Sequence, residues 1–392
     1  MRTQMENEAL VCFLEGRITS ENSSAVGEAI RAAMAEHPGA AAVLDADALT
    51  YITSAGLRVL LALGKEAAKP LMIRNVSPEV YQTLDITGFT SLMDVRRKPR
   101  EVSIDGCEII GSGAVGTVYR LDEDTVLKLY RNAAYYPMLE NELKRSKQAF
   151  LKGIPTAIPF DIVRVGDCLG TVFEMVKAES CNDALVRHPE NANALARQYA
   201  AFLKTIHSVE TEPGELPDAR DTFRNYLRLV TDRLPKETFE RVNRLLEALP
   251  YSGHVLHGDP QMKNVMMANG EMMLIDMDTL CVGDPVFELA GLYMSYICFT
   301  SVDPNDSMEF LGVERDVIQR VYHTFVEAYA ETSDPDRLRE VEDRAALMGC
   351  LRYLYVLTVL HMCKPGLEEV SLAFALDHIN ELAARVETLK LL

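Results

Sequence analysis

The stretch VLHGDPQMKNVM carries side chains whose types and spacing suit the transfer of a phosphoryl group. His257, Asp259 and Asn264 stand at the spacing H-x-D-x-x-x-x-N, and LIDMD follows with Asp276 and Asp278. Such a transfer needs a carboxylate that accepts the proton of the attacking hydroxyl, and oxygen ligands that hold magnesium against the phosphates. We therefore predict that Asp259 is the general base and that Asn264 and Asp276 are the metal ligands.

The other polar residues of this region have less specific expected roles. We expect His257 to hold the loop by hydrogen bonds rather than to transfer protons. Asp278 is interpreted as a second metal contact or a substrate contact, or equally as a loop carboxylate at the edge of the cleft. Asp284, in GDPVFELA, is expected to tie the loop to a helical region.

A glycine-rich loop lies well upstream of these residues. Gly111, Gly113 and Gly116 in IIGSGAVGTVY have the spacing G-x-G-x-x-G, which dinucleotide-binding turns share with loops that cover the phosphates of a nucleoside triphosphate. A dinucleotide-binding fold needs a helix directly after the glycines. Here two runs rich in Val, Leu and Tyr follow around an acidic turn, TVYRL-DED-TVLKLY, which predicts a β-hairpin. The pattern therefore favours a kinase-type loop.

The second strand of this hairpin supplies a lysine for the phosphates. Val126 and Lys128 are two residues apart and so share one face of the strand. We expect Val126 to contact the adenine, and we count Val118 on the preceding strand among the nucleotide-binding residues. A carboxylate must fix the lysine, and the helical stretch PMLENELKRSKQAFLKG offers Glu140 and Glu142. We favour Glu142 because it shares a helix face with apolar residues.

The composition is that of a globular protein of more than one domain. The chain has 392 residues, of which 48% are hydrophobic and 25% charged, and its formal net charge is −18. This charge disfavours nucleic acid and anionic membranes as partners, and no apolar run approaches the ~20 residues that span a bilayer. The eight cysteines are scattered and the N-terminus lacks a secretory signal pattern, so we expect a cytoplasmic protein.

Strands and helices alternate over the first hundred residues, which predicts a small α/β domain. We expect strands over residues 9–18, 40–46 and 71–76, and helices over residues 20–37, 54–68 and 77–87. The basic, proline-containing stretch DVRRKPRE at residues 94–101 is then expected to be an exposed linker. The predicted domains are therefore residues 1–98 and 99–392, the second with a sheet-bearing lobe over 99–178 and a helical lobe over 179–392.

Residues 102–392 resemble the aminoglycoside phosphotransferase and choline kinase-like family, which has a protein-kinase-like fold. The resemblance lies in GSGAVGTVY, VLKLY, HGDPQMKN and LIDMDTLCVGDPVFELA. It implies ATP and Mg²⁺ as cofactors, with Asp259 as base and Asn264 and Asp276 as metal ligands. Pro260 and Met262 depart from the commoner form of this loop. The short run from Asp276 to GDP leaves no long activation segment, which favours a small-molecule hydroxyl acceptor over a peptide.

Residues 5–95 resemble a STAS domain, the module of anti-sigma-factor antagonists. VCFLEGRIT, YITSAGL and DITGFTSLMDV match it in order. The resemblance implies that Ser54 is the phosphoacceptor and that a protein partner binds around it, where phosphate would add negative charge. Thr53 replaces the usual aspartate. Ser54 also stands where a helix begins, a position that suits either an ordinary cap or a bound phosphate.

The expected fold is therefore an α/β STAS-like N-terminal domain followed by an α+β, two-lobed, protein-kinase-like domain. Three functions compete. In the first, the protein is an ATP-dependent kinase of a small molecule whose STAS module regulates or localises it. In the second, it is a signalling protein whose phosphoacceptor is Ser54 or a partner protein. In the third, it is a scaffold that only binds nucleotide, which is the weakest reading because lysine, base and metal ligands are all present.

Overall fold

The structure, a computed structural model, describes residues 1–6, 8–67, 69–113, 116–132, 136–268 and 270–391. The chain divides into two compact units. One unit comprises Met1–Ser103 with Ile162–Leu169, and the other comprises Ile104–Asp161 with Gly170–Leu392. Within the described residues, no helix has the length and apolar character that crossing a lipid bilayer requires.

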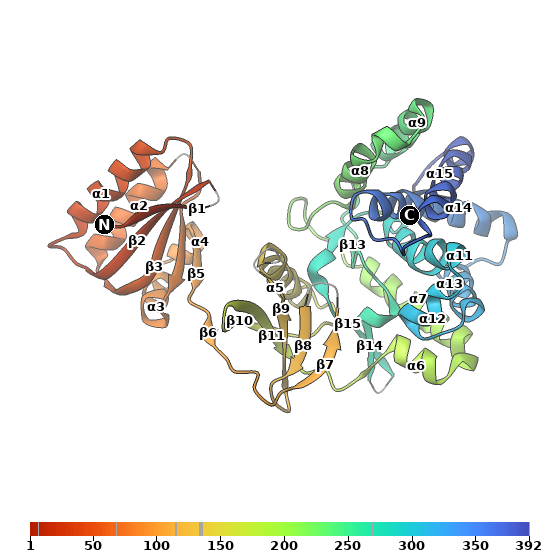
Figure 1. The fold of residues 1–392 in the computed structure, drawn as a ribbon, viewed down its shortest axis with the longest axis horizontal. Helices are drawn as coiled ribbons and strands as arrows, with labels where there is room; N and C mark the ends of the chain where they lie inside the picture. Colours follow the sequence, from red (N-terminus) through yellow and green to blue (C-terminus); the bar gives the residue numbers. More distant parts are fainter. Residues whose placement is uncertain (7, 68, 114–115, 133–135, 269, 392) are drawn as a thin grey trace. The chain divides into compact units, whose positions relative to one another are not determined.

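A five-stranded sheet with the order β1-β2-β3-β4-β5 forms the centre of the first unit. β1 runs antiparallel to β2, and the other neighbours are parallel. Helices α1 and α2 pack against each other beside the sheet (Figure 1). The strands are β1 (Thr3–Glu6), β2 (Ala9–Ile18), β3 (Ala41–Ile52), β4 (Met72–Val76) and β5 (Asp94–Arg97), and the helices are α1 (Ser23–Glu36), α2 (Ser54–Glu66), α3 (Pro78–Ile86) and α4 (Phe89–Leu92).

The predicted α/β alternation of this unit is confirmed, and local sequence explains it. The central parallel strands are apolar because helices and loops cover them, and Leu10, Leu44 and Ile73 lie buried in one core. Helix α3 begins at Pro78, whose ring suits a first helical position, while the Ser77 hydroxyl oxygen accepts a hydrogen bond from a backbone N–H of the first turn.

The expected linker at residues 94–101 is wrong for its first half. Asp94–Arg97 forms β5, parallel to β4 at the edge of the sheet. Only Val95 of this strand packs against the core, so its sequence shows no apolar alternation. Charged residues are a normal feature of edge strands because they discourage pairing with other chains. Arg100–Glu101 forms β6, which pairs with β10. The domain bounds 1–98 and 99–392 stay a prediction.

A six-stranded sheet with the order β6-β10-β11-β9-β8-β7 contains the predicted glycine-loop hairpin. Helix α5 (Tyr136–Leu151) follows β9 in the chain. Strands β7, β8 and β9 form an antiparallel meander in which Val118 pairs with Lys128. The remaining strands of this sheet are β7 (Glu108–Ser112), β8 (Gly116–Arg120), β9 (Thr125–Tyr130), β10 (Pro159–Val165) and β11 (Cys168–Glu174).

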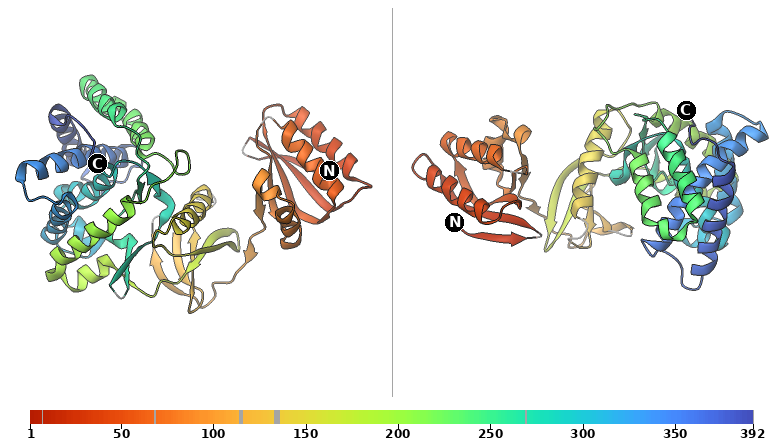
Figure 2. Two further views of the ribbon diagram at one scale, coloured as in Figure 1. Left: turned by 180° about the vertical axis from the view of Figure 1, so that it is seen from behind. Right: turned by 90° about the horizontal axis from the view of Figure 1, so that it is seen from above.

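The rest of the second unit is mainly helical, as the sequence predicts (Figures 1 and 2). Its helices are α6 (Cys181–Arg187), α7 (Ala192–His207), α8 (Ala219–Leu229), α9 (Lys236–Ala248), α10 (Val286–Tyr293), α11 (Phe299–Val302), α12 (Asp306–Leu311), α13 (Arg315–Ala330), α14 (Pro335–Thr358) and α15 (Glu368–Arg385). Two buried clusters of apolar side chains form its core, and α10 contributes to both.

Short strands between α9 and α10 position the loops of the candidate site. β14 pairs with β15 as a hairpin, and β13 pairs with β16. A short 3-10 helix, Met262–Asn264, leads into the hairpin, and another, Met277–Thr279, follows it. These strands are β13 (Val255–Leu256), β14 (Val265–Ala268), β15 (Glu271–Leu274) and β16 (Cys281–Val282). β12 (Glu179–Ser180), which precedes α6, pairs with β14.

We predict that residues 1–98 fold alone and that β5 is part of the folded module. Removing β5 exposes the edge of β4 and the part of the core against which Val95 packs. A fragment ending at Met93 should therefore melt at a lower temperature than the 1–98 fragment, by about 4–8 °C for each kcal/mol lost. Circular dichroism during heating measures both. Equal melting temperatures, or an unfolded 1–98 fragment, would show that β5 or the boundary is wrongly assigned.

Candidate active site

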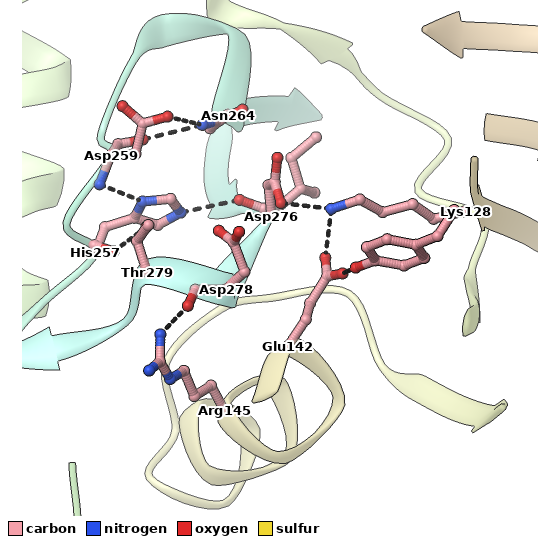
Figure 3. A network of polar contacts seen from close by, with 11 residues as sticks. Lys128, Glu142, Arg145, His257, Asp259, Asn264, Asp276, Asp278 and Thr279 are labelled. Atoms are coloured by element: carbon pink, nitrogen blue, oxygen red, sulfur yellow. Dashed lines mark hydrogen bonds and ion pairs between the residues drawn. The ribbon is translucent and has the colours of Figure 1, made fainter. Parts of the chain in front are cut away.

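Lys128 lies between two carboxylates that come from different parts of the second unit. Its Nζ is 2.9 Å from Glu142 Oε1 and 2.6 Å from Asp276 Oδ1 (Figure 3). Strand alternation explains the direction of the side chain, because the neighbouring Leu127 is fully buried on the other face of β9. The structure thus pairs Lys128 with Glu142, the glutamate that the sequence favoured.

Glu142 is the buried member of this cluster. Its side chain is 2% exposed, and its other carboxylate oxygen accepts a hydrogen bond from the Tyr130 hydroxyl. Burial raises the pKa of Glu142 to about 7 against the opposing charge of Lys128. Burial alone would lower the pKa of Lys128, but the carboxylates of Glu142 and Asp276 raise it above its ordinary value. Lys128 is therefore a cation that two carboxylates hold in place.

The glycine loop closes against the same strand. A Cβ on Gly116 would lie 2.4 Å from the carbonyl oxygen of Leu129, so only glycine allows β8 to approach β9 this closely. The Gly113 N–H donates to the Gly116 carbonyl, and Gly111 pairs with Val118 across the hairpin. Ala114 and Val115 between these glycines lie outside the described residues.

Asp259 lies in a loop between β13 and the Met262–Asn264 turn, held by two amide side chains. Gln261 Nε2 is 3.0 and 3.2 Å from the two carboxylate oxygens. Asn264 Nδ2 donates to the backbone carbonyl of Asp259 at 2.9 Å and lies 3.4 Å from its Oδ2 (Figure 3). The Asn264 amide nitrogen is thus used within the loop, which leaves its Oδ1 as the atom suited to a metal.

His257 is fully buried and holds the loop, as expected. Its Nδ1 accepts a hydrogen bond from the Asp259 N–H at 3.2 Å, so the ring proton is on Nε2, which donates to the Ile275 carbonyl at 2.9 Å. The adjacent Gly258 has φ +85°, and a Cβ there would lie 2.5 Å from the Thr279 carbonyl oxygen. The loop therefore requires a side-chain acceptor at position 257 and a glycine at position 258.

Glu288 is the anchor that sequence reasoning missed. Its carboxylate accepts hydrogen bonds from the backbone N–H groups of His257 at 2.9 Å and Gly258 at 2.8 Å, and His207 Nε2 lies 3.5 Å away. Burial would raise its pKa, but the hydrogen bond and charge of His207 and the Gly258 N–H lower it overall. A carboxylate inside the apolar run VFELAGLYMSY was the signal that could have revealed it.

Asp284 has a related structural role. One of its carboxylate oxygens accepts the Val286 N–H at 2.9 Å at the start of α10, and both lie within reach of the Leu391 N–H, at 3.2 and 3.0 Å. Asp284 therefore ties the segment after β16 to α10 and to the end of the chain, in agreement with the expected connection to the helical region.

Asp276 presents a carboxylate where a metal could bind. It adopts the left-handed conformation, with φ 63° and ψ 60°, which aspartate tolerates better than most residues. Its side chain is 42% exposed, and Asn264 lies beside it because the Asn264 carbonyl accepts the Ile275 N–H. A carboxylate with an amide oxygen suits magnesium, which usually takes one or two carboxylates together with substrate phosphates.

Asp278 lies next to this pair without a settled role. Burial, and then the charge of Asp276, raises the pKa of the Asp278 carboxyl to about 6. Arg145 of α5 donates a hydrogen bond to its backbone carbonyl (Figure 3). The structure thus places Asp278 in the short turn directly after Asp276.

A cavity of about 650 Å³ reaches Asp259 from the helical part of the unit. Arg352 of α14 lies at the same point, with Nη1 2.7 Å from the Gly258 carbonyl oxygen and Nη2 3.8 Å from the Asp259 carboxylate. The sequence pointed to neither the cavity nor Arg352. The lining residues are Tyr226, Asp259, Gln261, Met294, Ser295, Phe299, Val302, Asp303, Asp306, Phe310, Arg352, Tyr353, Tyr355, Val356, Leu360, Met362, Cys363, Lys364, Pro365, Leu367 and Ser371.

Ser54 lies in the first unit as the first residue of α2 and is exposed. Thr53 precedes the helix in an extended conformation, and its N–H donates to the Ile18 carbonyl. Gly56, buried beneath this turn, could not carry a side chain without contact with Ile18 and Ile52. The turn is therefore packed closely onto the ends of β2 and β3 while Ser54 remains accessible.

Two family profiles match this chain, in the order that the sequence predicts. Residues 106–341 match the phosphotransferase enzyme family, and residues 1–94 match the STAS domain described for Mlab. Because the first match spans more than half of the chain, the protein belongs to the phosphotransferase enzyme family. Its N-terminal module is a STAS domain, and its C-terminal domain is that of a phosphotransferase.

Two relatives show the same division. A Bordetella bronchiseptica protein named as an anti-sigma factor antagonist, BtrV, is 35% identical over 89 residues, which is 22% of this chain and 76% of the relative. The viomycin phosphotransferase of Streptomyces vinaceus is 29% identical over 142 residues, which is 32% of this chain and only half of that enzyme. Among solved structures, ADP-bound aminoglycoside phosphotransferase APH(2'')-Ib aligns with 78% of this chain and 99% of its own, with 16% identity and a TM-score of 0.48.

We predict that Glu288→Gln weakens both the fold and the catalytic loop. Glutamine has one acceptor oxygen for two N–H groups and turns its own amide donors toward one of them, so stability should fall by about 1–3 kcal/mol. The lowered pKa means that this contribution is present above the ordinary pKa of glutamate and is lost as pH falls through the lower folded value. The difference from wild type should therefore shrink in acid.

Urea unfolding at several pH values measures this difference. Glu340→Gln is the matched control, because the Glu340 side chain is exposed and pairs with Arg344 one helical turn away at 3.3 Å. Its effect should stay within about 0.5 kcal/mol. A Glu288→Gln protein as stable as this control at neutral pH would contradict the anchoring role.

Proposed function

We propose that the protein transfers the γ-phosphate of Mg-ATP to a hydroxyl group of a small molecule, with the STAS module serving regulation or partner binding. The observation that carries this proposal is the position of Lys128 between Glu142 and Asp276. That arrangement holds a cation for phosphates directly beside a carboxylate suited to magnesium. The cavity that opens at Asp259 gives the acceptor a place in the same domain.

The nucleotide would occupy the cleft lined by the small sheet. Gly111, Gly113 and Gly116 would cover the phosphates, and Val118 and Val126 would contact the base. Lys128 would bind phosphate oxygens while Glu142 keeps it in place. The pairing of Val118 with Lys128 across β8 and β9 supports this arrangement.

Asn264 and Asp276 would hold the magnesium ion, which when bound supplies positive charge against the phosphates. Asp259 would accept the proton of the acceptor hydroxyl as its oxygen forms the new bond to phosphorus and the bond to the ADP oxygen breaks. Gln261 and Asn264 would fix the carboxylate through the hydrogen bonds that they already make. Loop rigidity matters because small displacements of reacting groups are costly to rate.

The alternative acceptor within the chain is Ser54. It is exposed and begins a helix of 13 residues, where unpaired N–H groups favour a phosphate. However, it belongs to a folded module, so the whole module would have to dock at Asp259. A small molecule fits the cavity directly, and this favours the small-molecule acceptor.

We further propose that the surface around Ser54 binds a protein partner, which phosphate would repel or attract by its charge. The similarity to a protein named as an anti-sigma factor antagonist supports this role. A cytoplasmic location, and the absence of nucleic acid and membrane partners, remain predictions from composition and charge.

Asp259→Asn should leave Mg-ATP affinity close to wild type and reduce turnover by about 10²–10⁴, the range for loss of a general base. The reason is that asparagine keeps the size of the side chain and one acceptor oxygen for Gln261 but cannot accept the proton. Calorimetric titration measures the affinity, and ADP release measures turnover. Asn264→Ala and Asp276→Ala should instead raise the magnesium requirement or abolish activity. Wild-type turnover in Asp259→Asn would remove Asp259 from its assigned role.

A further inference from the structure

We infer that the acceptor of this phosphotransferase is a ring-bearing, largely apolar alcohol with at most one charge, and not a polycationic amino sugar. The inference rests on the proposed function and concerns the cavity at Asp259. The transfer itself is unchanged: the acceptor O–H bond breaks, its proton passes to Asp259, and the oxygen takes the phosphoryl group that ADP leaves.

The walls of the cavity are mainly aromatic and aliphatic. Tyr226 and Tyr355 stack with their ring centres 4.2 Å apart, and Phe299 packs edge-on against Tyr353 at 4.8 Å. All four line the cavity. Its volume of about 650 Å³ lies within the range of sites that take drug-sized molecules. Flat apolar rings are the groups that such walls bind best.

A lysine of the protein already pairs with the carboxylates in the wall. Lys364 Nζ lies 2.6 Å from Asp303, 3.4 Å from Asp306 and 2.8 Å from Glu309. Asp303 and Asp306 line the cavity, and the side chain of each is only 17% exposed. An ammonium group of a ligand would have to displace Lys364 to reach them. Asp303 and Asp306 therefore already share a cation, and a ligand with several ammonium groups would have to compete with Lys364 for them.

The reacting end of the cavity also carries positive charge. Arg352 lies 3.8 Å from the Asp259 carboxylate and is hydrogen-bonded to the Gly258 carbonyl, so it is fixed beside the base. An acceptor with amino groups around its hydroxyl would bring like charge against this guanidinium. Cavity-lining residues that carry full charge are three carboxylates and two cations, namely Asp259, Asp303, Asp306, Arg352 and Lys364.

Some of the apolar side chains that line this cavity are also exposed to solvent. Phe310, Leu360 and Met362 are 44%, 47% and 54% exposed, and all three line the cavity. Lys263 places its ammonium 4.0 Å from the centre of the Phe310 ring, which adds a further cation near the cavity. Exposed apolar side chains that gather at one site indicate a surface that binds apolar groups.

The test compares acceptors of matched ring and different charge on the full chain. Tryptophol is a neutral ring-bearing alcohol, tryptophanol has the same ring and hydroxyl with one ammonium group, and kanamycin is a polycationic amino sugar. We expect calorimetry on the wild-type protein with Mg-ADP, which allows no transfer, to give at least tenfold tighter binding of tryptophol than of kanamycin, and ADP release from Mg-ATP to follow the same order. Tighter binding of kanamycin, or saturable binding of neither alcohol, would overturn the inference.

A variant without Lys364 tests whether this lysine weakens the binding of kanamycin. Lys364→Met removes the cation that pairs with Asp303 and Asp306, so kanamycin binding should strengthen by about tenfold, equivalent to 1.4 kcal/mol. Lys204→Met is the matched control, because Lys204 pairs with Glu331 at 2.7 Å and does not line the cavity; it should leave kanamycin binding unchanged. Equal kanamycin binding in both variants would contradict the role of Lys364.

These tests distinguish a failure of the acceptor inference from a failure of the proposed function. Binding of Mg-ATP and slow ATP hydrolysis without any acceptor depend on the cleft at Lys128 and not on the cavity walls. A protein that binds and hydrolyses ATP but prefers kanamycin contradicts only the acceptor class. A protein that does neither contradicts the phosphotransferase proposal itself.

Discussion

The buried charge of Glu142 is the constraint on which the site depends. A carboxylate that is 2% exposed must be paired, because removing one partner of a buried ion pair costs about 3–5 kcal/mol. Lys128 and Tyr130 satisfy it from alternate positions of one strand, so the register of β9 and the position of α5 are fixed together. Asp276 meets the same lysine from the solvent side of the cluster. Folding therefore fixes Lys128 and Asp276 at the positions where they would bind phosphate and magnesium.

The helical part of the unit imposes a second constraint through backbone groups. Glu288 of α10 accepts the N–H groups of His257 and Gly258, and His257 in turn orients the Asp259 N–H. The proposed base, Asp259, is therefore positioned by a chain of hydrogen bonds that runs through buried residues. Asp259 and Gln261 line one end of the cavity, and most of its other walls come from α8, α11, α12, α14 and the segment after α14. This arrangement lets one phosphotransfer site serve different acceptors by changes in the cavity walls.

The sequence was sufficient for features that local chemistry determines. Hydrophobic periodicity predicted the α/β alternation of the first unit. The glycine spacing and the hairpin pattern after it predicted the strand that contains Lys128. The sequence was insufficient for features that depend on packing between segments far apart in the chain. Only one side chain of β5 packs against the core, so the strand has no hydrophobic alternation. Arg352 reaches Asp259 from α14, which lies far away in the sequence. No local pattern marks the cavity either, because its residues are scattered over several helices and become neighbours only in the fold.

The destination of the phosphate tests the central claim most directly. The full chain is incubated with Mg-ATP carrying a labelled γ-phosphate, in the presence of a pool of small alcohols, and label is measured separately in the small molecules and on the protein. The account predicts label in a small molecule, abolished in Asp259→Asn and retained in Ser54→Ala. Rapid stoichiometric label on Ser54 that is lost in both variants would contradict it and make the protein a self-phosphorylating switch.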